Sequence, residues 1–280
     1  MLPIDFQFSQ ACLQDFVDCR RRFWLRYIKR FAWPAIPAAP AREFERYILL
    51  GNRFHHLVHQ HRLGIPVEKL CAAIREDELH VWWENYLKTA DSLWENEEFY
   101  GSSLYAENIL STPLNGYRLI AKYDLLVISP QGKAMVVDWK TSRQSSESQR
   151  RRGLTQSLQT SVYPYVLVMA AGSSLNASLN PDHIEMVYWF TNFPNQPERF
   201  QYDKNRFDED KRILNDLSAQ ILSLAEDQFT QTPVEHYCRY CVYRSYCERG
   251  VGAGEIDIAE EVDTENPFTF DFDQIEEITL

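Results

Sequence analysis

A β-hairpin with an acidic residue on each strand is the strongest structural signal in this sequence. Apolar and β-branched residues fill the runs 119–128 and 134–140. The turn between them has Pro130 early and Gly132 late, as hairpin turns commonly do. With a three-residue loop and a left-handed Gly132, Ser129 pairs with the residue that follows the loop. This pairing fixes the register of the whole hairpin.

In this register Asp124 lies directly opposite Asp138. Side chains alternate between the two faces of a strand, so Lys140 shares the face of Asp138. Two carboxylates in such a pair would be about 5 Å apart. Like charges at that distance are costly unless a cation lies between them. The hairpin therefore predicts a divalent-metal site beside an ammonium group.

These side chains suit the hydrolysis of phosphodiester bonds. Mg²⁺ or Mn²⁺ held by a few carboxylates keeps positions open for water and phosphate. A lysine beside the ion can orient the attacking water or stabilise charge on the phosphoryl oxygens. Asp124, Asp138 and Lys140 supply this set of groups, and Glu107, on a preceding strand, is a further candidate acid.

The rest of the chain predicts an α/β fold with a central mixed sheet flanked by helices. The expected elements, in chain order, are helices at about 9–30, 42–62 and 74–95, a strand-rich centre at 103–140, a helix at 153–171, a strand at 183–191 and a helix at 205–228. Helices before the sheet, and an alternation of helix and strand after it, favour a layered domain. The expected boundaries are 1–250 for this domain and 251–280 for an acidic, flexible tail.

Asp124 followed by Asp138-Trp-Lys140-Thr141 resembles the signature of the PD-(D/E)XK nuclease superfamily, whose core is that of the restriction endonucleases. Gly51-Asn-Arg-Phe-His55 resembles the Gly-x-x-x-His motif of its RecB-like branch. The resemblance implies that His55 joins Asp124 and Asp138 at the metal. Gln159-Thr-Ser-Val-Tyr163 resembles the Gln-x-x-x-Tyr motif of the same branch, which implies that Gln159 and Tyr163 help to place the substrate.

The histidine has competitors in its own helix. His56 and His59 are close to His55 in the sequence, and a pair at i and i+4 can also bind zinc. Position within the motif favours His55.

Three cysteines near the C-terminus have the spacing of metal or cluster ligands. Cys238, Cys241 and Cys247 form Cys-x2-Cys-x5-Cys and need a fourth ligand. Cys19 resembles the early cysteine of iron–sulfur members of this branch, the AddB-type subunits and CRISPR-associated adaptation nucleases, which implies a [4Fe–4S] cluster. Cys12 is the competing fourth ligand, and zinc is the competing metal. Either metal would join the N- and C-terminal segments.

The charge distribution is compatible with a nucleic-acid partner. The net charge is −11, but residues 255–280 hold ten acids and no Lys or Arg, so the remainder has 30 acids against 29 bases. Clusters at Arg20–Arg22 and Arg150–Arg152 are candidates for phosphate contacts. We expect DNA, as single strands or ends, to be the partner.

The resulting expectation is a metal-dependent DNA nuclease, an exonuclease in repair or recombination. The alternatives are a CRISPR adaptation nuclease and a non-catalytic DNA-binding scaffold on the same fold. A helicase or other repair or adaptation proteins are the expected protein partners. No apolar stretch approaches 18 residues and no targeting segment is evident, so we expect a cytoplasmic protein with no membrane partner.

Overall fold

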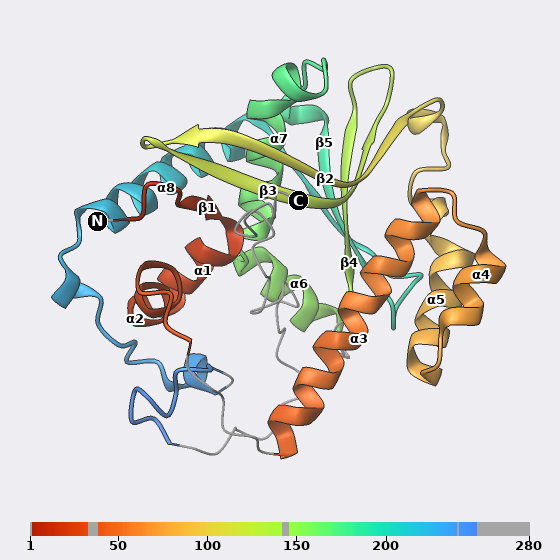
Figure 1. Ribbon diagram of the computed structural model, residues 1–280. Coiled ribbons are helices and arrows are strands. Elements are labelled where there is room, and N and C mark those ends of the chain that lie inside the picture. Colours follow the sequence, from red (N-terminus) through yellow and green to blue (C-terminus); the bar gives the residue numbers. More distant parts are fainter. Residues whose placement is uncertain (1, 33–38, 142–145, 240, 251–280) are drawn as a thin grey trace, which may run out of the picture.

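The computed structural model describes residues 2–32, 39–141, 146–239 and 241–250, and within them six strands form one mixed sheet (Figure 1). The order across the sheet is β1-β3-β4-β5-β6, with β2 paired to β3. β1 runs parallel to β3 and β4 parallel to β5, and the other pairs are antiparallel. The strands are β1 (Gln7–Ser9), β2 (Ser103–Leu114), β3 (Tyr117–Ile128), β4 (Ala134–Lys140), β5 (Ile184–Phe190) and β6 (Glu198–Gln201).

Helices cover both faces of this sheet (Figure 1). They are α1 (Gln10–Asp18), α2 (Arg20–Phe23), α3 (Ala39–Arg62), α4 (Val67–Ala73), α5 (Asp77–Thr89), α6 (Glu147–Gln156), α7 (Gln159–Ser174) and α8 (Lys204–Ser223). The predicted fold class, a mixed central sheet flanked by helices, is confirmed. None of the described helices combines the length and the apolar run that crossing a bilayer requires.

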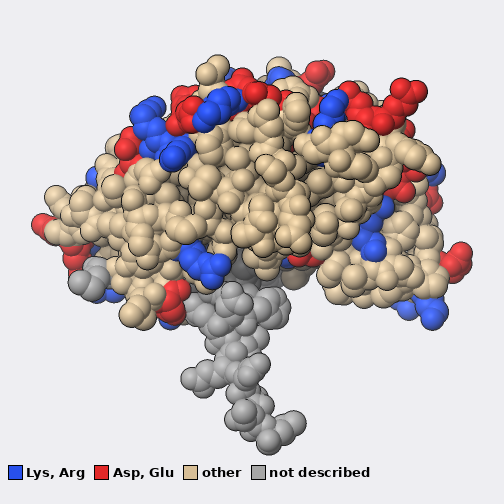
Figure 2. Space-filling model, turned by 90° about the horizontal axis from the view of Figure 1, so that it is seen from above, with Lys and Arg blue, Asp and Glu red and all other residues tan. Residues whose placement is uncertain are grey.

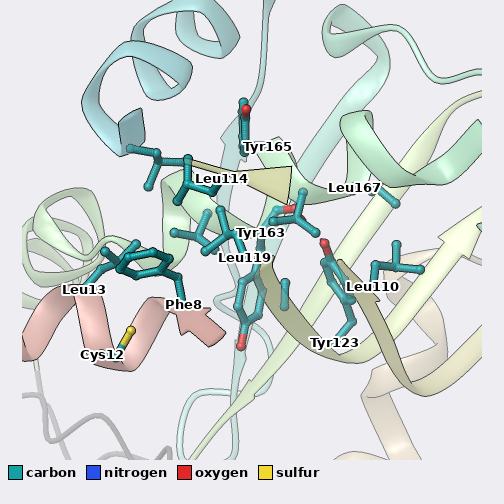
Figure 3. Packing of buried hydrophobic residues seen from close by; sticks show 14 of the residues in the cluster. Phe8, Cys12, Leu13, Leu110, Leu114, Leu119, Tyr123, Tyr163, Tyr165 and Leu167 are labelled. Atoms are coloured by element: carbon teal, nitrogen blue, oxygen red, sulfur yellow. Dashed lines mark hydrogen bonds between the residues drawn. The ribbon is translucent and has the colours of Figure 1, made fainter. Parts of the chain in front are cut away.

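Two hydrophobic cores lie against the sheet. The first core joins β1, β2 and β3 to α1, α7 and α8, and Figure 3 shows part of it around Phe8, Leu119 and Tyr123. The second core joins β4 and β5 to α3 and α5 and contains four fully buried tryptophans, Trp82, Trp83, Trp139 and Trp189. Burying one large apolar side chain stabilises a fold by roughly 1.5–3 kcal/mol, so the second core anchors α3 firmly beside the hairpin.

β4 is buried along its whole length because helices cover both faces. Its apolar run therefore lacks the alternation of a half-exposed strand. The turn that precedes it has the predicted geometry: Ser129 N donates to Lys133 O at 2.8 Å, and Gly132 is left-handed with φ +79°. The ladder pairs Leu125 with Val137, which confirms the predicted register.

The first predicted helix, at 9–30, is broken. Ser9 caps α1 as its side chain accepts from Cys12 N, but Cys19 is extended (φ −159°, ψ 106°) and ends the helix. α2 and a π-helical turn, Trp24–Ile28, follow. Arg21 N donates to Thr230 O at 3.0 Å, so this region is tied to the C-terminal segment instead of continuing one helix.

Two other predicted helices also differ from their expected bounds, the first by a shift of its start and the second by a break. The expected helix at 74–95 begins only at Asp77, after α4, because Glu76 is extended and the acids at 77 and 78 favour a helix N-terminus. The expected helix at 153–171 is α6 and α7. Ser157 separates them, since its Oγ accepts from Gln159 N at 3.2 Å and so supports a new helix start.

The short strands β1 and β6 were not predicted, and the last helix ends at Ser223, not near 228. The domain boundary at 250 remains a prediction. The predicted acidic tail, 251–280, lies outside the described residues.

Candidate metal and catalytic site

β3 changes face at Asp124. Up to Tyr123 its odd-numbered residues pack into the first core, whereas Leu125 and Val127 pack into the second. Strict alternation would keep them all on one side. Pairing with β2 is interrupted at the same point, between the pairs Tyr123–Asn108 and Leu125–Ala106.

Glu107 is the residue of β2 opposite this interruption, and its backbone is left-handed (φ +51°). A positive φ is uncommon for a residue with a side chain and marks local strain, which proteins retain mostly at functional positions. The bend in β2 and β3 brings the carboxylates of Glu107 and Asp124 toward the same point, where α3 passes.

Three ligand atoms of different side chains meet there. One atom each from His55, Glu107 and Asp124 lies within 4.8 Å of the other two. His55 comes from α3, Glu107 from β2 and Asp124 from β3. All three side chains are partly exposed, at 26%, 15% and 13%, so an ion and a substrate could reach them. One imidazole and two carboxylates form a donor set that suits Mn²⁺ or Mg²⁺.

Asp124 also closes the end of the hairpin. Its Oδ2 accepts from Trp139 N at 2.8 Å, in place of a carbonyl of β3. Its Oδ1 lies 3.1 Å from His55 Nδ1. Burial raises the pKa of Asp124, but the charge and hydrogen bond of His55, the Trp139 N–H and the Lys140 ammonium lower it below its usual value.

The same contacts act on His55 in the opposite direction. Burial lowers its pKa, whereas the carboxylate of Asp124, then those of Asp138 and Glu107, raise it to about 9. Without metal, His55 is therefore protonated at neutral pH. A metal ion must displace this proton, because only neutral imidazole is a ligand.

Asp138 lies beside this group and outside it. Its Oδ1 accepts from Gln159 Nε2 at 2.7 Å, and its Oδ2 is 3.2 Å from Lys140 Nζ. Lys140 Nζ in turn donates to Gln159 Oε1 at 2.8 Å. Two hydrogen bonds and one ion pair thus join these three buried side chains in one group. Of the expected ligands His55, Asp124 and Asp138, the structure brings the first two together with Glu107, whereas Asp138 is paired with the Lys140 ammonium.

Tyr163 lies one helical turn after Gln159. It is buried, its ring centroid is 5.2 Å from that of Tyr123, and its carbonyl accepts from the Tyr123 hydroxyl at 2.9 Å. Tyr163 thus supports the residue that precedes Asp124.

Gly51, the first residue of the resembled Gly-x-x-x-His motif, has a steric role. A Cβ at this position would lie 2.9 Å from Thr141 Oγ1. The absence of a side chain lets α3 approach the end of β4, which brings His55 to Asp124. His56, one of its competitors, is exposed.

Sequence reasoning missed one partner of the site. Lys122, two residues before Asp124 on β3, forms an ion pair with Glu107. Lys122 is two residues from Asp124, and this spacing was the signal that could have indicated it. Strict alternation along β3 did not predict the bend at Asp124.

The four predicted cysteine ligands line one small cavity. Cys19 reaches it from the break after α1, and Cys238, Cys241 and Cys247 reach it from the C-terminal segment. None of the four forms a disulfide. Cys12 is elsewhere: it is buried in the first core, hydrogen bonded to Ser9, and burial raises its pKa to about 12.

Arg22 lies at the same cavity and joins its two walls. It forms ion pairs with Asp15 and Asp18 at 2.7 Å each, and its Nη1 donates to Tyr237 O at 3.4 Å. The residues that contact the cavity thus include a cation, which favours bound thiolates.

The hairpin carries two acids and a lysine beside a histidine of a flanking helix, and this set of groups suits the hydrolysis of phosphodiester bonds. Residues 7–248 match the family model of the PD-(D/E)XK nuclease superfamily, and the chain belongs to this superfamily. Membership implies a hydrolase of phosphodiester bonds that uses divalent metal ions. No curated protein matches the sequence.

Comparison with solved structures gives one match that supports this fold. A protein from Eubacterium rectale described as a "putative exonuclease" matches with a TM-score of 0.51 and 10% identity, over 83% of this chain and 85% of that one. The structure of SSO0001 matches with a TM-score of 0.41 and 14% identity, over 87% and 86%. At 10% identity the similarity to the Eubacterium rectale structure concerns the fold alone.

Proposed function

We propose that this protein is a DNA exonuclease that acts on ends or single strands in repair or recombination, with Mg²⁺ or Mn²⁺ at the site. The observation that carries the proposal is the meeting of His55, Glu107 and Asp124 next to the ammonium of Lys140. A nuclease needs both parts, an ion to bind phosphate and water and a fixed cation near the developing charge.

His55, Glu107 and Asp124 would hold the ion. The bound ion supplies Lewis-acid activation of the phosphate and lowers the pKa of water. Asp124 is fixed for this role by the Trp139 N–H, and Glu107 by the bend of β2. Lys122 balances the charge of Glu107 from the open side.

Lys140 and Asp138 act together at the substrate. Gln159 holds both, so the ammonium is already oriented before DNA binds. The ammonium can donate to a non-bridging phosphoryl oxygen or orient the attacking water. Asp138 is the counter-ion of Lys140, so this buried ammonium is paired.

The name of the Eubacterium rectale neighbour supports the exonuclease activity within this proposal. The membership of the superfamily alone is equally compatible with a CRISPR adaptation nuclease. A non-catalytic scaffold is less compatible, because a protein that only binds DNA does not require the buried Asp138–Lys140–Gln159 group.

We further propose that Cys19, Cys238, Cys241 and Cys247 hold a [4Fe–4S] cluster. Four thiols from both ends of the domain meet at one cavity beside Arg22, and such a donor set fits an iron–sulfur cluster or zinc. The cluster would close a long loop and so stabilise the contact between α2 and the C-terminal segment. A brown protein that contains iron supports the cluster, and a colourless protein with one zinc contradicts it.

The nuclease proposal is tested by digestion of end-labelled single- and double-stranded DNA with Mg²⁺ or Mn²⁺. We expect wild type to release nucleotides from ends and Lys140→Ala to lose most of this activity. Lys133→Ala is the matched control, since Lys133 lies on the same hairpin but pairs with Glu98 at the surface. Equal digestion by wild type and Lys140→Ala would contradict the proposal.

A further inference from the structure

Arg150, on α6, is a buried cation that the site described above does not use. Its side chain is fully inaccessible to solvent. The guanidinium carbon lies 4.3 Å from the ring centroid of Phe193 and 5.1 Å from that of Phe190. Nη2 donates to Gln196 Oε1 at 3.2 Å, whereas Nε and Nη1 have no hydrogen-bond partner.

Such an arrangement is costly for the protein alone. A guanidinium remains charged at any physiological pH, so it cannot avoid the cost by losing a proton. Contacts with aromatic rings offset only part of the desolvation. In the described part of the chain no carboxylate forms an ion pair with Arg150. The two unused donors therefore indicate an anionic ligand.

The position of Arg150 identifies the kind of anion. Phe190 is the residue of β5 paired with Lys140 of β4. Lys140 Nζ lies 5.4 Å from the ring centroid of Tyr188, two residues earlier on β5. Tyr188 and Phe190 share a face of the sheet and are roughly 7 Å apart along the strand. Arg150 and Lys140 thus occupy successive positions on that face, a separation comparable with that of successive phosphates in a polynucleotide.

We propose that Arg150 binds the phosphate adjacent to the one cleaved, and that this contact fixes the register of the strand at the ion. The inference rests on the proposed nuclease function. Nη1 and Nη2 form one edge of the guanidinium, and this edge matches two non-bridging oxygens of a phosphate. In the DNA-free protein Nη1 donates no hydrogen bond, and Nη2 donates only to Gln196.

Access requires little movement. Gln196 is exposed and Phe193 is partly exposed, so Arg150 lies one layer below the surface. Side-chain rotations of this size are common when partners bind. A rotation of Gln196 would exchange its amide oxygen for a phosphate oxygen on Nη2.

The alternative is that Arg150 only packs against the two phenylalanines. Anisotropy of a labelled single strand, measured in EDTA at several salt concentrations, separates the two roles. In the alternative, Arg150→Met leaves DNA affinity and its salt dependence unchanged. If Arg150 binds phosphate, Arg150→Met weakens DNA binding on the order of tenfold, because one charge-assisted hydrogen-bond contact is lost. The slope of log affinity against log salt also falls by about 0.7, the value for one phosphate contact with a single strand.

Arg151→Met is the control for Arg150→Met, because Arg151 is 54% exposed and already paired with Glu198 at 3.0 Å. The slope of log affinity against log salt for Arg151→Met should match that of wild type. If both variants reduce the slope equally, the effect is general electrostatics and the proposal is overturned.

A second pair of variants does not depend on the folding of Arg150→Met. Gln196→Glu places a carboxylate on Nη2 and should compete with phosphate, so it weakens binding more than Asn195→Asp, which adds the same charge on the same exposed turn. Equal effects of Gln196→Glu and Asn195→Asp overturn the proposal. Digestion of DNA by the wild-type protein is measured in parallel. If the wild-type protein neither cleaves nor binds DNA, the proposed function itself fails. If it cleaves DNA and these variants have no effect on binding, only the inference about Arg150 is removed.

Discussion

Binding of Mn²⁺ should depend steeply on pH because His55 must lose a proton first. With a pKa of about 9, His55 is almost fully protonated at pH 7 in the metal-free protein. Each pH unit below the pKa lowers the apparent affinity about tenfold, so the affinity at pH 7 should be about 100-fold below that above pH 9. One proton should be released for each ion bound.

Titration calorimetry in two buffers of different ionisation enthalpy measures both quantities. His55→Asn is the informative variant, because it removes the titrating group and should flatten the pH dependence between 7 and 9. His56→Asn, at the exposed neighbour, should behave as wild type. An affinity that is equal at pH 7 and pH 9, with no proton release, would refute both the raised pKa and the role of His55 as ligand.

The same pKa predicts how the stability of the metal-free protein changes with pH. The pKa of His55 is higher in the folded state than its ordinary value of 6.5. Its contribution, about 3 kcal/mol, is therefore fully present below pH 6.5 and is lost as pH rises through 9. Urea unfolding in EDTA at pH 6 and pH 9 should show this loss in wild type and not in His55→Asn.

Three other variants test the steric role of Gly51, the role of Asp138 and the identity of the fourth cysteine ligand. Gly51→Ala should lower the free energy of unfolding by about 1–3 kcal/mol in urea unfolding, because the new Cβ meets Thr141 Oγ1. The additional change Thr141→Ala should recover part of this loss, and if the effects of the two changes simply add, the steric explanation is contradicted. Asp138→Asn should reduce the rate of cleavage roughly 100-fold or more, because Asp138 orients Lys140. Its Mn²⁺ affinity should stay within a fewfold of wild type, because Asp138 lies outside the ligand group, and a large loss of that affinity would make Asp138 a ligand instead. Cys19→Ala should abolish the iron content and visible absorbance, whereas Cys12→Ala should retain both, and retention by Cys19→Ala would exclude it as the fourth ligand.

Much of the architecture was predictable from local pattern. The hairpin register followed from one turn and a run of β-branched residues, since each pair in a ladder fixes the next. The fold class followed from the order of the elements. The meeting of Cys19 with the C-terminal cysteines at one cavity agrees with the resemblance.

The bend of β3 was not predictable, because it depends on the left-handed Glu107 of a different strand. Alternation placed the two aspartates face to face, but the bend turns Asp124 toward His55 and leaves Asp138 with Lys140. The breaks at Cys19, Glu76 and Ser157 depend on tertiary contacts and capping that helical periodicity does not report. Arg150 is buried by residues forty or more positions away, so its sequence cluster resembled a solvated helix face.

Charges on the surface give little guidance to the path of DNA. On the face shown in Figure 2, among the described residues, Lys and Arg are interspersed with Asp and Glu around a broad uncharged area. No single sign dominates that face, so steering by a large basic field is not expected from it. The individual cations Lys140 and Arg150 are instead the groups that we expect to contact phosphate.

Anomalous diffraction from crystals soaked with Mn²⁺ tests the metal site most directly. We expect a peak about 2.0–2.3 Å from one ligand atom each of His55, Glu107 and Asp124. In Glu107→Gln we expect this peak to be lost. A peak held by Asp138 without Glu107, or no peak at this group while the wild-type protein cleaves DNA, would contradict the proposed ligand set.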